Sequence, residues 1–80
     1  MNKTQIIARI DLLMAVFHWT IEHNIGLNAG QRICITMERV ALLRCLEAIR
    51  ANPYLTPLPK YVLPPALNEK VVHIYRNTIK

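Results

Sequence analysis

Histidine, cysteine and carboxylate side chains are the residues of this chain that could do chemistry, and their spacing does not favour it. His18 and Glu22 are four residues apart and could chelate a metal ion from one face of a helix. Cys34 and Cys45 lack the close spacing of metal ligands, and His73 is distant from both in sequence. We therefore expect no metal site.

Nucleophilic catalysis would need a thiol or hydroxyl, a base and an orienting group brought together by the fold. Cys34 or Cys45 with a histidine and Asp11 could form such a set, but both cysteines lie in apolar runs, where cysteine is normally a small core residue. The two glycines provide no glycine-rich phosphate loop, and five acidic residues give little support for a catalytic carboxylate pair. We expect no enzyme activity and no cofactor.

The composition predicts one small domain, residues 1–80, with an apolar surface. Hydrophobic residues make up 52% of the chain and charged residues 19%, and a domain this small buries only about 60–65% of the surface of its unfolded chain. We therefore expect some apolar surface to meet another chain. The net charge of +5 favours an acidic partner, although a charge of this size also serves solubility.

The sequence predicts a cytoplasmic protein without a membrane segment. Residues 6–17 are apolar, but Arg9 and Asp11 interrupt them, and no small-residue cleavage site follows, so a secretion signal is not expected. No stretch reaches the roughly 20 apolar residues that cross a bilayer. Two cysteines in such a chain are expected to be reduced thiols.

Hydrophobic periodicity predicts a mainly α, compact three-helix domain, with helices at about 4–24, 37–51 and 66–78 and a connector at 52–65. The first helix has a core stripe at helical spacing, which comprises Ile6, Ile10, Leu13, Phe17 and Ile21. Its second apolar row comprises Ala8, Leu12, Ala15 and Trp19. The second helix repeats this arrangement, with a core stripe of Leu42, Cys45, Leu46 and Ile49 and a second row of Met37, Ala41 and Ala48.

Residues 31–35 allow two interpretations. Ile33, Cys34 and Ile35 are prone to β structure and precede a good N-cap at Thr36, so we favour a short extended piece. Against this, Asn28 and Gln31 have the spacing of a capping box. A helix begun at Ala29 would place Arg32, Arg39 and Arg50 on one stripe. Periodicity alone cannot decide for so short a run.

The connector at 52–65 holds five prolines but is too apolar for a solvated linker. We expect an extended segment that lies across the helices and covers one of their exposed rows. Pro65 suits the first position of the third helix. Gly26 is expected to be the left-handed residue that ends the first helix, with Leu27 packed back onto its last turn.

Protein binding is the function that the sequence favours, because both long helices carry apolar rows on two faces and no catalytic motif is present. Tryptophan, tyrosine and arginine dominate interface energetics. The expected partner-binding residues are Leu12, Trp19, Arg39, Arg44, Arg50, Tyr54 and Tyr61. The arginines would steer the chain toward an acidic partner surface, and a homodimer is one way to cover the row from Leu12 to Trp19. Small size without a motif is common among phage and plasmid accessory proteins, including inhibitors that occupy an enzyme's surface.

Nucleic-acid binding is the alternative, since three helices and a basic charge fit the helix-turn-helix class in general. The candidate contacts are Arg39, Arg50, Lys70, His73, Arg76 and Lys80. Acidic residues interleave with them at Glu38, Glu47 and Glu69. The proline-rich connector also stands where that motif needs a tight turn.

Overall fold

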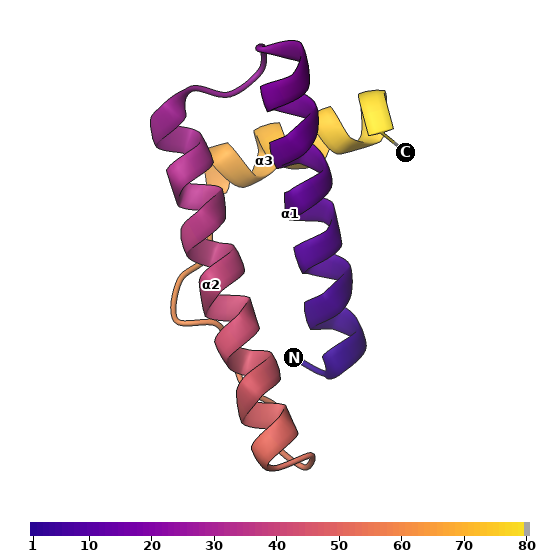
Figure 1. The fold of residues 1–80 in the computed structure, drawn as a ribbon, viewed down its shortest axis with the longest axis vertical. Helices are drawn as coiled ribbons and strands as arrows, with labels where there is room; N and C mark the ends of the chain where they lie inside the picture. The colour runs from indigo at the N-terminus through magenta and orange to yellow at the C-terminus, as the bar shows by residue number, and fades with distance from the viewer. Residues whose placement is uncertain (80) are drawn as a thin grey trace.

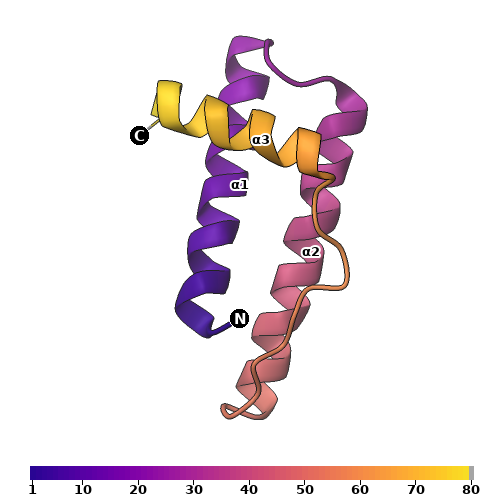
Figure 2. The same ribbon diagram turned by 180° about the vertical axis from the view of Figure 1, so that it is seen from behind.

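Three helices make up the computed structural model, which describes residues 1–79: α1 (Lys3–His23), α2 (Ala29–Ala51) and α3 (Pro65–Ile74). One π-helical turn, η1 (Tyr75–Ile79), continues α3. α1 and α2 lie side by side and run in opposite directions, and α3 crosses one face of the pair near the turn that joins them (Figures 1 and 2). The residues described contain no strand, so the mainly α, three-helix prediction is confirmed.

An asparagine caps each end of α1. The backbone N–H of Gln5 donates to Oδ1 of Asn2 (2.8 Å), and the N–H of Asn2 donates to Oε1 of Gln5 (3.0 Å), so two first-turn amides are satisfied reciprocally. Asn24 is the left-handed residue at the other end (φ 53°). The sequence prediction gave that role to Gly26, which also has a positive φ (92°) but lies beyond the cap, inside the turn.

α2 begins at Ala29, so the favoured extended piece at 31–35 was wrong and the capping-box alternative is confirmed. The N–H of Gln31 donates to Oδ1 of Asn28 (2.8 Å), and the N–H of Asn28 donates to Oε1 of Gln31 (3.0 Å). Ile35 is fully buried, in helical register with Leu42. Thr36 is therefore no N-cap. It lies inside the helix, where its hydroxyl donates to the carbonyl of Arg32 (3.1 Å).

The core lies where the three helices meet. Its buried apolar side chains are Ile6, Leu13, Val16, Leu27, Ile35, Leu42, Cys45, Leu63, Leu67, Val71 and Ile74. Two details differ from the predicted stripe of α1: Ile21 is 51% exposed, and Thr20 is buried, with its hydroxyl donating to the carbonyl of Phe17 (3.0 Å). α3 and η1 pack against α1. This contact moves the buried side of α1 away from Ile21 and toward Val16 and Thr20.

An ion pair with a buried carboxylate links the three helices and the connector. Arg9 Nε in α1 donates to Oε2 of Glu38 in α2 (2.6 Å), and Arg9 Nη2 donates to Oε1 of Glu38 (3.2 Å) and to Oδ1 of Asn68 in α3 (2.7 Å). The N–H of Leu63 in the connector donates to Oε1 of Glu38 (2.8 Å). The Glu38 side chain is only 2% exposed, and these donors satisfy its carboxylate, as burial of a charge requires.

The connector, residues 52–64, is extended and returns along α2 toward the start of α3 (Figure 2). Met1 helps to hold it, because its amino group donates to the carbonyl of Pro57 (3.0 Å). Leu63 enters the core, Tyr61 is half-buried, and Leu58 stays exposed. Pro65 occupies the first position of α3, where a missing N–H has no cost. The third helix, predicted to run unbroken to about residue 78, widens to the π-helical turn after Ile74.

Candidate protein-binding groove

The histidine, cysteine and acidic side chains were the candidates for chemistry. Among residues 1–79, no three of them lie close enough together to hold a metal ion. Both cysteines are free, and no hydrogen bond joins either one to a histidine here. His23 stacks on Trp19 (ring centroids 4.5 Å apart), and His18 meets Phe17 edge to face (5.8 Å). These histidines cover apolar surface.

An exposed apolar row runs along the outer side of α2. Ile33, Met37 and Val40 follow one another at i, i+4 and i+7, so they share one helix face. Ile33 is 61% exposed and Met37 is 46% exposed. Arg44 continues the row one turn later. The core takes the opposite side of the helix, through Ile35, Leu42 and Cys45, so nothing within α2 itself covers the outer row.

The connector turns this row into one wall of a groove. A hollow of about 400 Å³ lies between the α2 residues Ile33, Thr36, Met37, Val40, Ala41 and Arg44 and the connector residues Lys60 and Tyr61. A second hollow, of about 230 Å³, lies next to it and is lined by Ala41, Arg44, Cys45, Ala48, Pro57, Leu58 and Lys60. The two share Ala41, Arg44 and Lys60, so they adjoin, and together we call them the α2–connector groove.

Among the described residues that line the groove, the charged side chains are both cationic. Arg44 stands on α2 and Lys60 stands on the connector. Within residues 1–79 the one ion pair is that of Arg9 with Glu38, so neither cation of the groove has a carboxylate partner there. The groove is thus an apolar channel with unpaired positive charge on both walls.

Tyr61 closes one part of the groove and has a perturbed hydroxyl. Its interaction with the Cys34 thiol is the main cause that raises the pKa of Tyr61 above its ordinary value of 10.0. Partial desolvation and the negative charge of Glu38 act in the same direction. The phenol is therefore neutral throughout the physiological range.

The structure brings together only part of the predicted partner-binding set. Arg44 and Tyr61 line the groove. Leu12 and Trp19 are half-buried and pack against the core. The remaining members lie outside the groove: Arg39 and Arg50 on α2, and Tyr54, 94% exposed, in the turn that follows α2.

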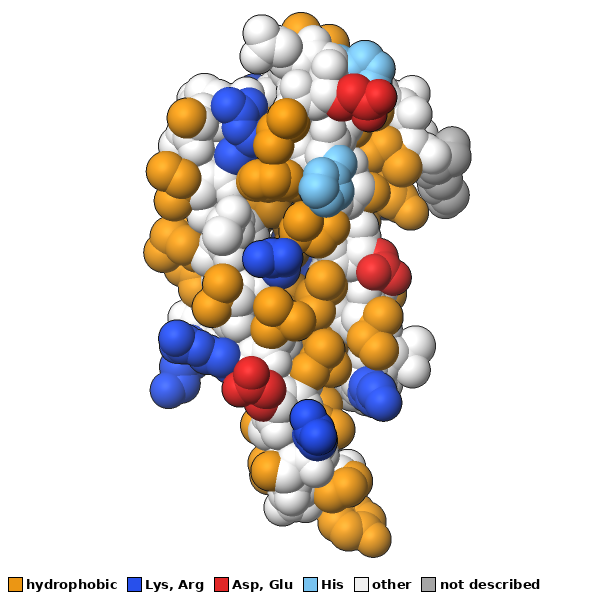
Figure 3. All heavy atoms as spheres, in the orientation of Figure 1, with side chains coloured by type: hydrophobic (Ala, Val, Ile, Leu, Met, Phe, Trp, Pro, Cys, Tyr) orange, Lys and Arg blue, Asp and Glu red, His pale blue; other side chains and the backbone are white. Residues whose placement is uncertain are grey.

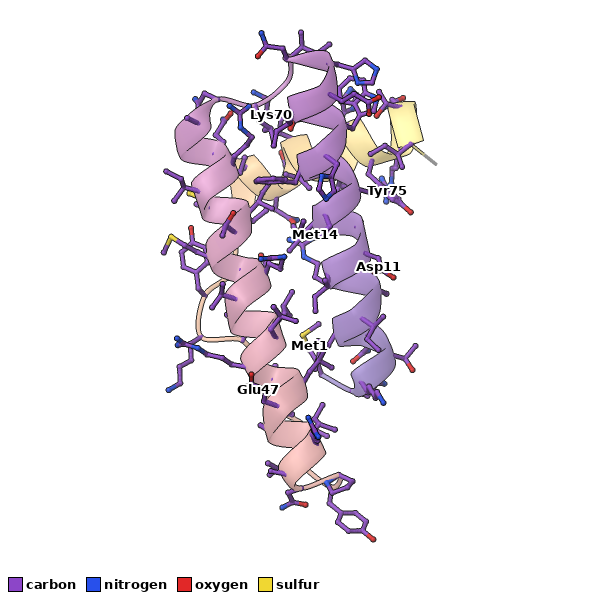
Figure 4. The ribbon with its side chains drawn as sticks, viewed as in Figure 1. Met1, Asp11, Met14, Glu47, Lys70 and Tyr75 are labelled. Carbon is purple, nitrogen blue, oxygen red and sulfur yellow. The ribbon has the colours of Figure 1, made fainter. Side chains whose placement is uncertain are left out.

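The predicted nucleic-acid set is divided between two regions. Lys70, His73 and Arg76 are exposed on α3 and η1, and Lys70 lies behind the upper ends of α1 and α2 in Figure 4. Arg50 is in the last turn of α2, near the end where Figure 4 places Glu47. Arg39 is half-buried near the middle of α2, so the α2 members of the set are spread along that helix, with Arg50 at the end away from its start. Lys80 lies outside the described residues.

Sequence reasoning missed several residues that line the groove, among them Ile33, Val40, Leu58 and Lys60. The signal for the first two was present. Once the helix begins at Ala29, Ile33, Met37, Val40 and Arg44 form one uninterrupted row. An extended piece at 31–35 cuts that row after Ile33 and hides it. No pattern in the sequence indicated which side of α2 the connector would follow.

No known protein family, curated protein or solved structure matches this chain. Among the residues described, no helix is both long and apolar enough to span a lipid bilayer. Figure 3 shows that hydrophobic side chains also cover much of the front of α1 and α2, with lysines and arginines among them. Ile7, Ile21 and Leu43 are exposed apolar residues outside the groove.

Proposed function

We propose that this chain is a small, non-enzymatic protein-binding module that holds an apolar segment of a partner protein in the α2–connector groove. The observation that supports this most directly is the uncovered row of Ile33, Met37 and Val40 beside the connector. Exposed contiguous apolar surface rimmed by polar residues is typical of protein–protein interaction sites. Binding is stoichiometric, and the module modulates or inhibits its partner by occupying part of that partner's surface.

The mode of action follows from the composition of the groove. Apolar side chains provide the buried area, and Arg44 supplies the type of residue that is enriched in interface hot spots. The excess of positive charge increases the rate of encounter with an acidic partner more than it increases the final affinity. The groove is formed by a capped helix and by a connector that hydrogen bonds hold at Pro57 and Leu63, so little ordering entropy is lost on binding.

Comparative capture tests this function. The chain is immobilised as wild type, as the groove variant Met37→Asp/Val40→Asp, and as the control Ile7→Asp/Ile21→Asp. The control makes the same chemical change at two exposed positions of α1 outside the groove. We expect wild type and control to capture the same protein from a lysate of the native host and the groove variant to lose it. The captured protein is then purified and titrated calorimetrically, where we expect one-to-one binding.

Loss of the captured protein by the control as well as by the groove variant would remove the groove from the proposal. Circular dichroism of all three proteins excludes unfolding as the cause of a loss. Trp19→Ala tests binding only at a temperature where the variant is shown to be folded, because Trp19 packs against the core and its removal would also destabilise the fold.

Nucleic-acid binding is the second proposal, supported by the net charge and by the shared exposure of Lys70, His73 and Arg76. A gel-shift titration against duplex and single-stranded DNA tests it, since phosphate contacts make affinity fall steeply with salt. Absence of a shift at low salt would rule this class out.

A further inference from the structure

The two cations of the groove indicate what kind of partner it accepts. Arg44 on α2 and Lys60 on the connector both line the groove, and none of the described residues that line either hollow is acidic. Burying an unpaired charge against an apolar partner is costly. A partner that brings a carboxylate to this point satisfies both cations, and the apolar row of α2 requires apolar side chains on either side of that carboxylate.

The backbone of the connector disfavours an extended occupant. An added strand gains its affinity from a ladder of main-chain hydrogen bonds. Pro57 and Pro59 lack N–H groups, so alternate positions on one edge of the connector have no donor to offer. α2 cannot help, because its backbone groups are used within the helix. A helix needs no such ladder, since its own main chain is already paired.

The length of the groove also suits a helix. The lining residues of α2 extend from Ile33 to Ala48, which is about 22 Å along a helix axis. A partner helix of about 15 residues covers this distance with apolar side chains at every third or fourth position. Its flank toward the connector then carries the carboxylate.

We propose that the occupant of the α2–connector groove is an acidic amphipathic helix of another protein, with a carboxylate seated between Arg44 and Lys60. This inference rests on the proposed function, which requires only that the groove binds some apolar segment. A second copy of this chain is disfavoured as the occupant. A two-fold contact through the groove would bring the same patch of each protomer together, and with it four unpaired cations.

Designed peptides test the proposal. A fluorescein-labelled helical peptide of about 16 residues carries leucines at helical spacing and glutamates on its flanks. It is titrated with the full chain and followed by fluorescence anisotropy. One comparison peptide replaces the glutamates with lysines, and a second keeps the glutamates but has a proline at its centre. A labelled DNA duplex is the fourth probe.

We expect the acidic helix to bind at least about tenfold more tightly than the lysine helix, with an affinity that decreases as salt rises. The proline peptide should lose affinity by a similar factor, because its helix is interrupted. The charge reversal Arg44→Glu/Lys60→Glu should lower the affinity for the acidic helix at least about tenfold and raise the affinity for the lysine helix. The control Lys3→Glu/Lys70→Glu changes net charge equally at exposed positions outside the groove, and we expect it to change affinity less than about threefold.

Equal binding of the acidic and lysine helices, or equal effects of the two charge reversals, would overturn the proposal. So would a DNA duplex that binds more tightly than the acidic helix and is released by Arg44→Glu/Lys60→Glu. A dimer in solution that this double variant dissociates would assign the groove to a second copy instead. If the groove variant Met37→Asp/Val40→Asp loses the natural partner while the acidic helix is not preferred, this inference fails but the proposed function does not.

Discussion

Glu38 and Arg9 are 29 residues apart in sequence, yet they form the one ion pair among residues 1–79, with Nε 2.6 Å from Oε2. Glu38 faces the core between Ile35 and Leu42, where its helix position would suit an apolar residue. The pair also fixes the connector through the N–H of Leu63. One buried carboxylate thus ties α1, α2 and the connector together next to the groove.

Replacing Arg9 by methionine should therefore be strongly destabilising. The substitution keeps most of the apolar stem but leaves Glu38 buried with one charge and no cation. We expect the free energy of unfolding to fall by about 2–4 kcal/mol, a large part of the stability of so small a domain. Urea denaturation followed by circular dichroism measures this. Adding Glu38→Met should recover part of the loss, and strictly additive effects would show that the two residues are not coupled.

The start of α2 is tested by comparing two candidate caps. Asn28→Ala removes the side chain that accepts from the N–H of Gln31, and we expect a loss of about 1 kcal/mol. Thr36→Ala removes a hydroxyl inside the helix, at an exposed position, and should change stability by less than about 0.5 kcal/mol. The opposite order of the two effects in urea denaturation would place the helix start near residue 37.

The helices could be predicted because their signals are local. The periodicity of α1 and α2 and the proline at the start of α3 lie within single segments, and so does the capping box at Asn28, which correctly indicated the start of α2. The β-branched pair Ile33 and Ile35 outweighed that cap in the sequence interpretation. In the structure tertiary burial of Ile35 overrides its β propensity.

The groove could not be predicted because it depends on contacts between distant segments. The prolines indicate an extended connector, but its path follows from the hydrogen bond of Leu63 to Glu38 and that of Met1 to Pro57. Those bonds bring Lys60 to the same hollows as Arg44. Burial of Glu38 depends in turn on Arg9 in another helix, and no spacing rule within α2 reports it.

The two glycines should respond oppositely to alanine. Gly26 has φ +92°, and a Cβ there would lie 3.3 Å from Cδ1 of Ile74, so Gly26→Ala should cost about 1–3 kcal/mol. Gly30 lies in the first turn of α2, with only Oδ1 of Asn28 near its added Cβ (3.4 Å). Gly30→Ala should stabilise the chain by about 0.5 kcal/mol, because alanine has the higher helix propensity. Thermal denaturation of both variants checks the two signs.

The Tyr61 hydroxyl should make stability depend on alkaline pH. Its pKa is raised in the folded chain, mainly by Cys34, so the folded state disfavours the phenolate relative to the unfolded state. This contribution to stability is complete below the unfolded pKa of about 10 and is lost as the pH rises through the folded value. Absorbance titration of the tyrosines, compared with Tyr61→Phe, identifies the ionisation of Tyr61 as the step at higher pH that the variant lacks. Cys34→Ala should move that step back toward pH 10, and no movement would contradict the assigned cause.

Substitution of Met37 should affect mainly partner binding, whereas substitution of Trp19 should affect mainly stability. Met37 is 46% exposed in the groove, so Met37→Asp should lower the free energy of unfolding by only about 1 kcal/mol, from lost apolar contact and lower helix propensity. It should weaken binding of the partner at least about tenfold. Trp19 packs against the core and stacks on His23, so Trp19→Ala should cost about 2–3 kcal/mol. At a temperature where this variant is still folded, its affinity should stay close to that of wild type. Calorimetric titration of the partner against both variants, with urea denaturation of each, measures the two quantities. A folded Trp19→Ala protein that loses the partner while Met37→Asp keeps it would move the binding surface from the α2–connector groove to α1.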